Sequence, residues 1–456
     1  MASLRSVLAA AISRGCRLAV TTQSGSLSNS SKSLLVQQVR PKSSLAGREY
    51  LQQIPRIVSA VPACHQTAKV IFDDNKTAEF KYIWLRDNCK CPLCVDVDTR
   101  QKLLDTPALD PKIKPKALQI NDRGDLVITW QSHGGEEHVS TFTNDWLYRY
   151  GQCFMHDTFT APATLEEDGA WPRPPLTLWN RYIIQKRLPE VDYQEFIESD
   201  DALFEWLDMF YKFGFAMLRN VPTDPDQLKE VVGRFAYIKE TQYGVTWSVR
   251  IDPTPGVHLF QTGLRLQLHT DMNYRENSPG MQLLHCLKAE HPDKLGRDPG
   301  GQSFFVDGFR VAKWMEDNEP SAYHILTSTP ILFSIKNKGQ RYGNMVPIIV
   351  TDSEGDVTEI HYNNRTMGPL QAPDHVVVPF YHAYKLFSER MRQESQQLTF
   401  HLQPGDVVAF NNRRVMHGRG SYDPNKVERH LRGCYVDIDE AFSKYDQMLS
   451  QRPPLL

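Results

Sequence analysis

The sequence lacks three features that would place it in a special class of protein. It contains no run of 18 apolar residues, so we expect no membrane-spanning helix. Its formal net charge is -2, which gives no electrostatic footprint for binding nucleic acid. Its eight cysteines are too few and too unevenly spaced for the disulfide framework of a secreted domain. What remains is an ordinary globular composition in a chain of 456 residues, long enough for two or three domains.

The first 48 residues contain no Asp or Glu but are rich in Ser and Ala. Their basic residues are Arg5, Arg14, Arg17, Lys32, Arg40, Lys42 and Arg48. Leu4, Leu8, Ile12 and Leu18 fall near one face of a helix, with the arginines off it. This pattern is typical of a mitochondrial transit peptide, so we expect residues 1–48 to be a disordered leader and the protein to act in the matrix. A disordered tail without a targeting role is the alternative.

Residues 55–150 read as a small domain of short strands and turns. Lys69–Phe72 and Ala78–Leu85 flank the turn-forming residues 73–76, which predicts a hairpin. Leu126–Trp130 and Glu137–Phe142 predict a second hairpin.

Three of the eight cysteines crowd into six residues between these hairpins. Cys89, Cys91 and Cys94 are close enough for their thiolates to converge on one ion. A structural zinc ion needs a fourth ligand, usually His or Cys, and His138 on the second hairpin is the first candidate, with His133 second. Reduced thiols that bind no metal are the alternative.

A stretch rich in Pro and Trp, residues 151–190, predicts a linker to the remaining chain, residues 191–446. In this second domain we expect helices after Asp192 and over residues 224–235, and a buried strand over Phe213–Arg219. Short strands follow, interrupted by one helix at Pro379–Arg392. The pattern favours a mainly β fold with flanking helices, a double-stranded β-helix (jelly roll), preceded by the small zinc-binding β domain.

The central signal in the second domain is His269-Thr270-Asp271 with a distant His417. Two histidines and one carboxylate form the facial triad of non-haem Fe(II) enzymes, which leaves positions open for a co-substrate and O2. His269 and Asp271 are two residues apart, so one strand end can present both on the same face. We therefore take His269, Asp271 and His417 as candidate iron ligands and catalytic residues.

Iron at such a site needs a co-substrate that supplies two electrons, and a 2-oxo acid can chelate it. The far carboxylate of that acid then needs a cation, for which arginine is the preferred partner. Arg429 is the candidate, and the hydroxyl of Ser303 could add a hydrogen bond. Arg413, Arg414 and Arg419 are nearer in sequence, but we expect them to support the backbone or lie on the surface.

Several short motifs, taken together in their order along the chain, resemble the family of γ-butyrobetaine and trimethyllysine dioxygenases, the oxygenases of carnitine biosynthesis. The resemblance covers residues 65–445. They are residues 83–89 with the cysteine cluster, 243–247, the H-T-D motif, 283–286, 306–309, 362–364 and 429–435. The resemblance implies hydroxylation of a trimethylammonium carboxylic acid with Fe(II), 2-oxoglutarate and O2, with ascorbate keeping the iron ferrous. It also implies a possible homodimer.

The positions that match the family's cage around the quaternary ammonium group are Tyr243, Trp247, Phe260 and Tyr435. Asn363 matches a position that binds the substrate carboxylate. Two other carboxylate-side positions differ, because Met272 replaces a tyrosine and Val257 replaces an asparagine. Asn273, Tyr274 or Arg275 could substitute.

The sequence therefore predicts an oxygenase that converts γ-butyrobetaine to L-carnitine and binds neither nucleic acid nor membrane. The first alternative is trimethyllysine hydroxylation. A catalytically silent metabolite-binding barrel and a cupin-type enzyme with another metal are further alternatives.

Overall fold

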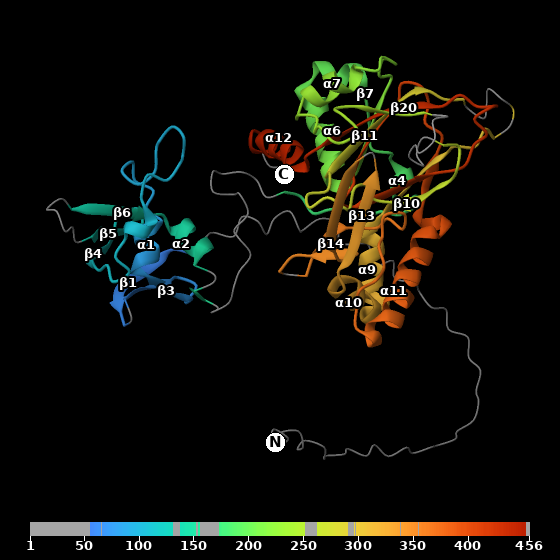
Figure 1. Ribbon diagram of the computed structural model, residues 1–456. Coiled ribbons are helices and arrows are strands. Elements are labelled where there is room, and N and C mark those ends of the chain that lie inside the picture. The colour runs from blue at the N-terminus through green and yellow to red at the C-terminus, as the bar shows by residue number, and fades with distance from the viewer. Residues whose placement is uncertain are drawn as a thin grey trace, which may run out of the picture. The chain divides into compact units, whose positions relative to one another are not determined.

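The structure is a computed structural model that describes residues 55–64, 66–130, 137–151, 154–155, 173–250, 262–290, 296, 298–337, 339–353 and 355–452 (Figure 1). The predicted transit peptide lies outside these residues. The N-terminal part, up to residue 155, and the C-terminal part, from residue 173, are described separately.

The N-terminal part contains two antiparallel sheets of three strands each among its described residues. The first sheet comprises β1 (Ile57–Ala63), β2 (Thr67–Phe72) and β3 (Thr77–Lys81), and the second β4 (Pro115–Ile120), β5 (Leu126–Trp130) and β6 (His138–Phe142). The helices are α1 (Tyr82–Asp87), η2 (Thr106–Ala108) and α2 (Asn144–Tyr150). Alternate residues of each sheet, such as Phe72, Phe80, Ile128 and Trp130, share one apolar core.

Both predicted hairpins are present, but the strand expected to run to Leu85 ends at Lys81. Residues 82–87 form α1 instead. Tyr82 and Leu85, three residues apart, are both buried, which is the spacing of a helix face. The helix directs the chain into the cysteine cluster.

In the C-terminal part, six described strands form one sheet in the order β7-β8-β18-β11-β20-β9. Their bounds are β7 (Glu190–Asp192), β8 (Phe215–Arg219), β9 (Trp247–Val249), β11 (Met281–Lys288), β18 (Val407–Asn411) and β20 (His430–Val436). Four more form a second sheet in the order β10-β19-β12-β17. These are β10 (Leu266–His269), β12 (Ser303–Asp307), β17 (Leu398–Phe400) and β19 (Val415–Arg419).

The central strands of the larger sheet are buried on both faces because successive side chains enter different cores. In β18, Val407 and Ala409 pack against one set of helices, whereas Val408 and Phe410 face the second sheet. Phe410 meets Phe305 of β12 with ring centroids 5.5 Å apart. The two sheets therefore share an interlocked aromatic core.

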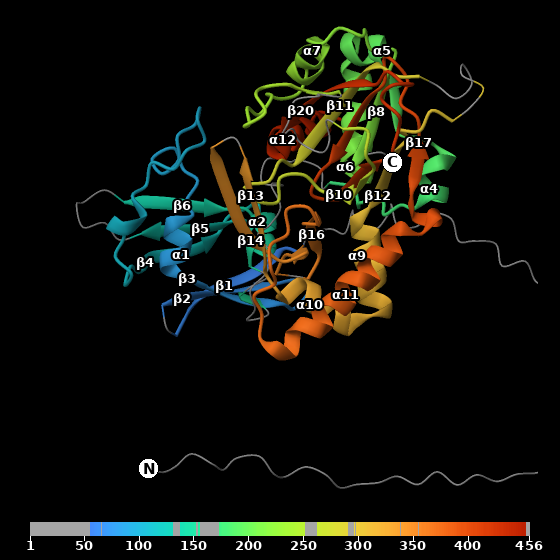
Figure 2. The same ribbon diagram turned by 45° about the vertical axis from the view of Figure 1, so that its right-hand side comes forward.

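Helices cover the outer face of the larger sheet (Figure 2). They are α5 (Tyr193–Glu198), α6 (Asp200–Phe213), α7 (Gln227–Gly233) and α12 (Ile438–Ser450). The hydroxyl of Ser199 accepts bonds from the N–H groups of Asp201 and Ala202 at the start of α6. Gly214 ends this helix at φ 64°, a left-handed conformation that glycine adopts easily. The predicted strand over residues 213–219 accordingly begins at Phe215.

A second group of helices follows the smaller sheet and lies side by side in both views (Figures 1 and 2). It comprises α9 (Gly308–Asn318), α10 (Pro320–Ser328) and α11 (Asp374–Arg392). The sequence did not predict α9 and α10, and the helix predicted from Pro379 begins at Asp374. Two hairpins accompany the group: β13 (Ile331–Asn337) with β14 (Gln340–Val346), and β15 (Ile349–Thr351) with β16 (Val357–Ile360). The short helices α4 (Arg181–Lys186) and η5 (Glu394–Gln396) also belong to this part.

Part of the predicted linker packs into the C-terminal core. Trp179 is fully buried, and its backbone N–H donates to Asp307 at 2.9 Å. Asp307 also forms an ion pair of 2.9 Å with Arg414, and both side chains are buried. Asp307 therefore ties the entering chain, the start of α9 and the turn before β19 together. We keep the division of the chain into domains as a prediction.

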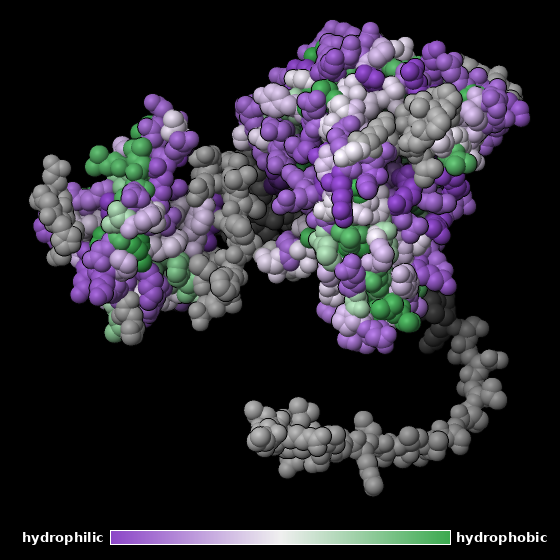
Figure 3. Space-filling model, in the orientation of Figure 1, coloured by the Kyte–Doolittle hydropathy of each residue, from purple (hydrophilic) through white to green (hydrophobic). Residues whose placement is uncertain are grey.

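The surface shown in Figure 3 is mostly hydrophilic, with apolar side chains exposed in small groups. No helix within the described residues is long and apolar enough to cross a membrane.

Candidate metal centre and active-site cavity

A cavity of about 320 Å³ is lined by strands of both sheets in the C-terminal part. This size suits a small molecule bound among a few polar groups. Its wall contains the candidate residues His269, Asp271, His417, Arg429, Ser303, Tyr243, Trp247, Asn363 and Tyr435, together with Met272, Tyr274, Arg365 and Arg419. Phe260 and Val257 lie outside the described residues. The structure thus brings the described candidates for the iron, 2-oxoglutarate and the ammonium cage, together with Asn363, to one cavity, whereas Asn273 and Arg275 do not line it.

The three candidate iron ligands converge from two neighbouring strands. His269 ends β10, Asp271 follows it, and His417 lies opposite His269 within β19. Nε2 of His269 is 3.3 Å from Oδ1 of Asp271, and Nε2 of His417 is 3.7 Å from Oδ2. All three ligand atoms lie within 4.8 Å of one another. This donor set on one side of a cavity could hold Fe(II) and leave positions open.

Hydrogen bonding and burial prepare these side chains for a metal ion. Nδ1 of His269 lies 2.7 Å from the Gln267 carbonyl, so its N–H donates there and Nε2 is left as the ligand atom. Burial, helped by His269, lowers the pKa of His417 to about 3. Burial alone would raise the pKa of Asp271, but the hydrogen bond to His269 and the electrostatic interactions with His417, His269 and Arg365 outweigh it and hold that pKa well below its usual range. A neutral imidazole and an ionised carboxylate are the forms that bind metal.

The backbone of the H-T-D motif is fixed from two sides. Asn412 accepts from the Asp271 N–H at 2.7 Å and donates to the Asp271 carbonyl at 3.0 Å. On the other side the Thr270 N–H donates to the Tyr362 carbonyl at 2.8 Å. Met272 then adopts φ 60°, a left-handed conformation that methionine rarely takes. Such strain next to candidate ligands is characteristic of functional sites.

Arg429 meets the requirement for a carboxylate partner of a 2-oxo acid. It directly precedes β20, and burial lowers the pKa of its guanidinium. No carboxylate in the described part of the chain pairs with it. A desolvated cation without a counter-ion is costly, and a bound carboxylate would remove that cost. Ser303, the first residue of β12, lines the same cavity.

The three nearer arginines support the backbone, as predicted. Arg413 donates to the Ser278 carbonyl at 2.7 Å, and Arg414 to the carbonyls of Lys212 and Thr177 at 2.9 and 2.7 Å. Arg419 donates to the carbonyls of Thr262 and Leu264. Its side chain also lines the cavity.

Aromatic rings form another part of the wall. The rings of Trp247 and Tyr435 lie 5.4 Å apart, and those of Tyr243 and Trp247 6.4 Å apart. The hydroxyl of Tyr435 donates to Oδ2 of Asp271 at 3.0 Å. Tyr274, one of the three residues considered above as substitutes on the carboxylate side, joins this aromatic group. Its hydroxyl lies 3.2 Å from that of Tyr243. Faces of Trp and Tyr attract a quaternary ammonium ion, which cannot donate hydrogen bonds.

The other sequence candidates for the carboxylate side are engaged elsewhere. Asn273 is buried and exchanges hydrogen bonds with Thr270 at 3.1 and 3.3 Å. Arg275 donates to Gln242, and its guanidinium lies 4.5 Å from the ring centroid of Tyr342. Met272 is buried and adds apolar surface to the cavity wall.

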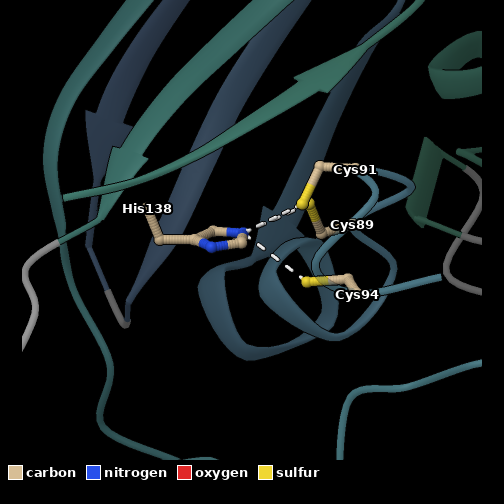
Figure 4. A group of neighbouring side chains, drawn as sticks. All are labelled: Cys89, Cys91, Cys94 and His138. Carbon is tan, nitrogen blue, oxygen red and sulfur yellow. Dashed lines mark hydrogen bonds between the residues drawn. The ribbon is translucent and has the colours of Figure 1, made fainter. Parts of the chain in front are cut away.

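In the N-terminal part, Cys89, Cys91, Cys94 and His138 come together as predicted (Figure 4). Nε2 of His138 lies 3.3, 3.7 and 3.6 Å from the three sulfur atoms. In a zinc tetrahedron, with Zn–S about 2.3 Å and Zn–N about 2.0–2.1 Å, sulfur and nitrogen are about 3.5 Å apart. The group is therefore a possible structural zinc site. His133 lies outside the described residues.

The folding of the chain around this cluster explains how the four side chains meet. Cys89 follows α1, and the N–H groups of Cys94 and Val95 both donate to the Cys91 carbonyl, which forms a tight turn. His138 begins β6, paired with Trp130. Burial raises the pKa of Cys94 to about 11, although Arg86 donates to its sulfur at 3.3 Å. A metal ion must therefore displace a proton from this thiol.

Two residues near the candidate iron ligands were not predicted from the sequence. Asn412 has no motif of its own, and its contact with Asp271 spans 141 residues. Arg365 follows the matched Asn363 by two residues, which is the one signal that could have drawn attention to it.

Comparisons with known proteins agree with this arrangement. Residues 174–435 match the family described as taurine catabolism dioxygenase TauD, TfdA family, and residues 64–148 match the gamma-butyrobetaine hydroxylase-like N-terminal family. The gamma-butyrobetaine dioxygenase of Pseudomonas sp. (strain AK-1) is 33% identical over 82% of this chain and 92% of its own. The human gamma-butyrobetaine dioxygenase is 32% identical over 84% of this chain and 94% of its own.

The mitochondrial trimethyllysine dioxygenase of Rattus norvegicus is 31% identical over 80% of this chain and 81% of its own. Among solved structures, an asparagine oxygenase in complex with Fe(II), 2S,3S-3-hydroxyasparagine and succinate has a TM-score of 0.42 and 16% identity, covering 52% of this chain and 79% of its own. The fold, the site and the relatives define a dioxygenase that depends on Fe(II) and 2-oxoglutarate. The chain belongs to the TauD/TfdA family, within the group that contains the gamma-butyrobetaine and trimethyllysine dioxygenases.

Proposed function

We propose that this dioxygenase hydroxylates a trimethylammonium carboxylic acid, and that γ-butyrobetaine, converted to L-carnitine, is its substrate. One observation carries the proposal: a metal-type triad, a desolvated arginine and a group of aromatic faces line the same cavity. The names of two relatives, from Pseudomonas and human, support the choice of substrate.

In this proposal His269, Asp271 and His417 hold Fe(II), and Arg429 binds the far carboxylate of 2-oxoglutarate, with Ser303 beside it. When bound, the iron with 2-oxoglutarate and O2 supplies the oxidant for an unactivated C–H bond, and the co-substrate leaves as succinate and CO2. The chain's own residues position the reactants. Apolar residues on the same wall, among them Leu284 and Phe305, limit the entry of water.

Tyr243, Trp247 and Tyr435 bind the trimethylammonium group through their ring faces, and Phe260 is proposed to complete the group. Because Tyr435 also donates to Asp271, the cation is held within a short distance of the iron ligands. A neighbouring carbon of the substrate is thereby presented to the open metal positions. Asn363 is proposed to lie at the carboxylate end.

Trimethyllysine hydroxylation is the second candidate. Met272 bears on this choice, since the position after H-T-D lacks the tyrosine expected for the γ-butyrobetaine enzyme. The relative from Rattus norvegicus supports it at a similar identity.

A panel of trimethylammonium acids separates the candidates. Purified protein with Fe(II), 2-oxoglutarate and ascorbate is given γ-butyrobetaine, trimethyllysine or a related betaine, and succinate and the hydroxylated product are quantified. We expect the highest kcat/KM with γ-butyrobetaine. Turnover of trimethyllysine alone would establish the second candidate instead.

We also propose a double-stranded β-helix core preceded by a small domain that Cys89, Cys91, Cys94 and His138 stabilise around zinc. A mitochondrial matrix location is proposed because residues 1–48 are basic and contain no Asp or Glu. The location of a reporter protein fused to this segment tests it. The proposed homodimer is tested by sedimentation.

A further inference from the structure

Three arginines line the cavity, and two of them already have a role. Arg429 is assigned to 2-oxoglutarate. Arg419 donates to the carbonyls of Thr262 and Leu264, and its guanidinium lies 5.0 Å from the ring centroid of Tyr422. Within the described residues, the side chain of Arg365 forms neither a hydrogen bond nor an ion pair. It is exposed and lines the cavity. One cation of the cavity wall is therefore available to a ligand.

The backbone of Arg365 is held against the H-T-D motif by its neighbour Asn363. Nδ2 of this buried asparagine donates to the Thr270 carbonyl at 3.1 Å, and its Oδ1 accepts from the Arg365 N–H at 3.1 Å. The Tyr362 N–H donates to the Thr270 hydroxyl at 3.0 Å. These bonds anchor the turn after β16 to the residue between two iron ligands. The guanidinium therefore starts from a fixed point on the cavity wall.

The same contacts limit the ability of Asn363 to bind a substrate carboxylate. Its oxygen and one of its two N–H groups are used within the protein, so at most one N–H remains for a ligand. Asn273, Tyr274 and Arg275 are likewise bonded to protein groups. Met272 has no polar hydrogen to donate. A substrate carboxylate bound only by these residues would be poorly paired, at a considerable cost in free energy.

The charges in the cavity lead to the same residue. Asp271 is the one acidic side chain among its described lining residues, and it belongs to the metal triad. The aromatic group suits the cationic end of the proposed substrate. The anionic end needs a positively charged side chain other than Arg429, which is assigned to 2-oxoglutarate. An arginine offers a planar pair of N–H donors that match a carboxylate.

We propose that Arg365 binds the substrate carboxylate and replaces the contact that the family's tyrosine makes after the H-T-D motif. Asn363 acts as a positioning residue that holds the Arg365 backbone. This inference rests on the proposed function, because it assumes a substrate with a trimethylammonium group at one end and a carboxylate at the other. It applies equally to γ-butyrobetaine and trimethyllysine, since both carry a carboxylate.

The test compares Arg365→Met, Arg365→Lys and a control, Arg341→Met, at an exposed arginine of β14 that does not line the cavity. For each protein, KM and kcat are measured with the better trimethylammonium acid and with its methyl ester, and KM is measured for 2-oxoglutarate. Arg365→Met should raise KM for the acid about 10- to 100-fold, since it removes a charge-assisted pair of hydrogen bonds. Values for the ester and for 2-oxoglutarate should change less than about threefold.

The KM of Arg365→Lys for the acid should lie between those of wild type and Arg365→Met. Lysine keeps the positive charge but lacks the planar pair of N–H donors that arginine offers a carboxylate. The control, Arg341→Met, should have the KM and kcat values of wild type. An unchanged KM for the acid in Arg365→Met, or an equal rise for acid and ester, would overturn the inference. A rise confined to 2-oxoglutarate would assign Arg365 to the co-substrate. If wild-type protein turned over no trimethylammonium acid, the proposed function itself would fail, a result distinct from these.

Discussion

The hydroxyl of Tyr435, in β20 of the larger sheet, donates across 3.0 Å to Oδ2 of Asp271, which lies two residues after the end of β10 in the smaller sheet. An aromatic ring proposed to face the substrate is thus bonded directly to a proposed iron ligand. The bond orients the carboxylate, and Tyr435 lies at a position where the two sheets meet.

Tyr435→Phe keeps the ring and removes this hydrogen bond. Loss of a partner that orients a metal ligand typically weakens metal binding by 10- to 100-fold, so we expect the Kd for Fe(II) to rise about tenfold. KM for the trimethylammonium substrate should change less than about threefold, because the ring face remains. Anaerobic Fe(II) titration and steady-state kinetics measure the two quantities. A raised KM with unchanged iron affinity would contradict the ligand-orienting role.

Asn412→Ala removes both hydrogen bonds that hold the Asp271 backbone, and a third to the Pro279 carbonyl at 2.9 Å. Because the site is fully buried, we expect the free energy of unfolding to fall by roughly 2–4 kcal/mol. Iron affinity should fall as well. Urea denaturation of the metal-free protein measures the first effect, and Asn425→Ala, in an exposed turn, is the control. Equal free energies of unfolding of the two variants would show that the Asn412 hydrogen bonds to Asp271 do not stabilise the fold.

Sequence motifs predicted the proposed iron site, whereas the structure showed which residues support the candidate ligands. His269, Asp271, His417 and Arg429 are recognisable because their chemistry requires those residue types. Asn412 escaped notice because its role depends on a contact across 141 residues. The φ of 60° at Met272 was equally hidden, since methionine has no preference for that conformation.

The fold was predicted in the same uneven way. Both N-terminal hairpins carry clear alternation and turn residues, and both are present. Helix α9 was missed because its first turn directly follows β12, with Asp307 serving as strand end and N-cap at once. His417 lies within β19, which follows β18 after the short turn at residues 412–414.

Zinc binding in the N-terminal part should release protons. Burial raises the pKa of Cys94 to about 11, so this thiol is protonated at pH 8 until a metal ion binds. We therefore expect zinc affinity to fall as the pH is lowered, and a weakly buffered titration of chelator-stripped protein to acidify. Cys91→Ala should lose the zinc, whereas Cys64→Ala, at an exposed cysteine outside the cluster, should keep it. Full zinc retention by Cys91→Ala would contradict the proposed ligand set.

His285 should make the folded protein sensitive to acid. It is fully buried, neither ring nitrogen has a partner among the described residues, and burial lowers its pKa from 6.5 to about 4. Between these two pH values the unfolded chain binds more protons, so the free energy of unfolding decreases as the pH falls from about 6.5 to about 4. The full difference corresponds to roughly 3 kcal/mol at most.

His285→Leu should lose this part of the pH dependence. Urea denaturation of variant and wild type at several pH values in the same window measures it. Identical slopes for the two proteins would show that other groups cause the acid sensitivity.

Separate measurements of Fe(II) and 2-oxoglutarate binding by Asp271→Ala and Arg429→Met test the account most directly. Asp271→Ala should lose the iron and, with it, succinate formation. Arg429→Met should retain about one Fe(II) per chain, while its Kd for 2-oxoglutarate rises by at least about tenfold. An Asp271→Ala protein that kept its iron and its full activity would contradict the proposed metal centre.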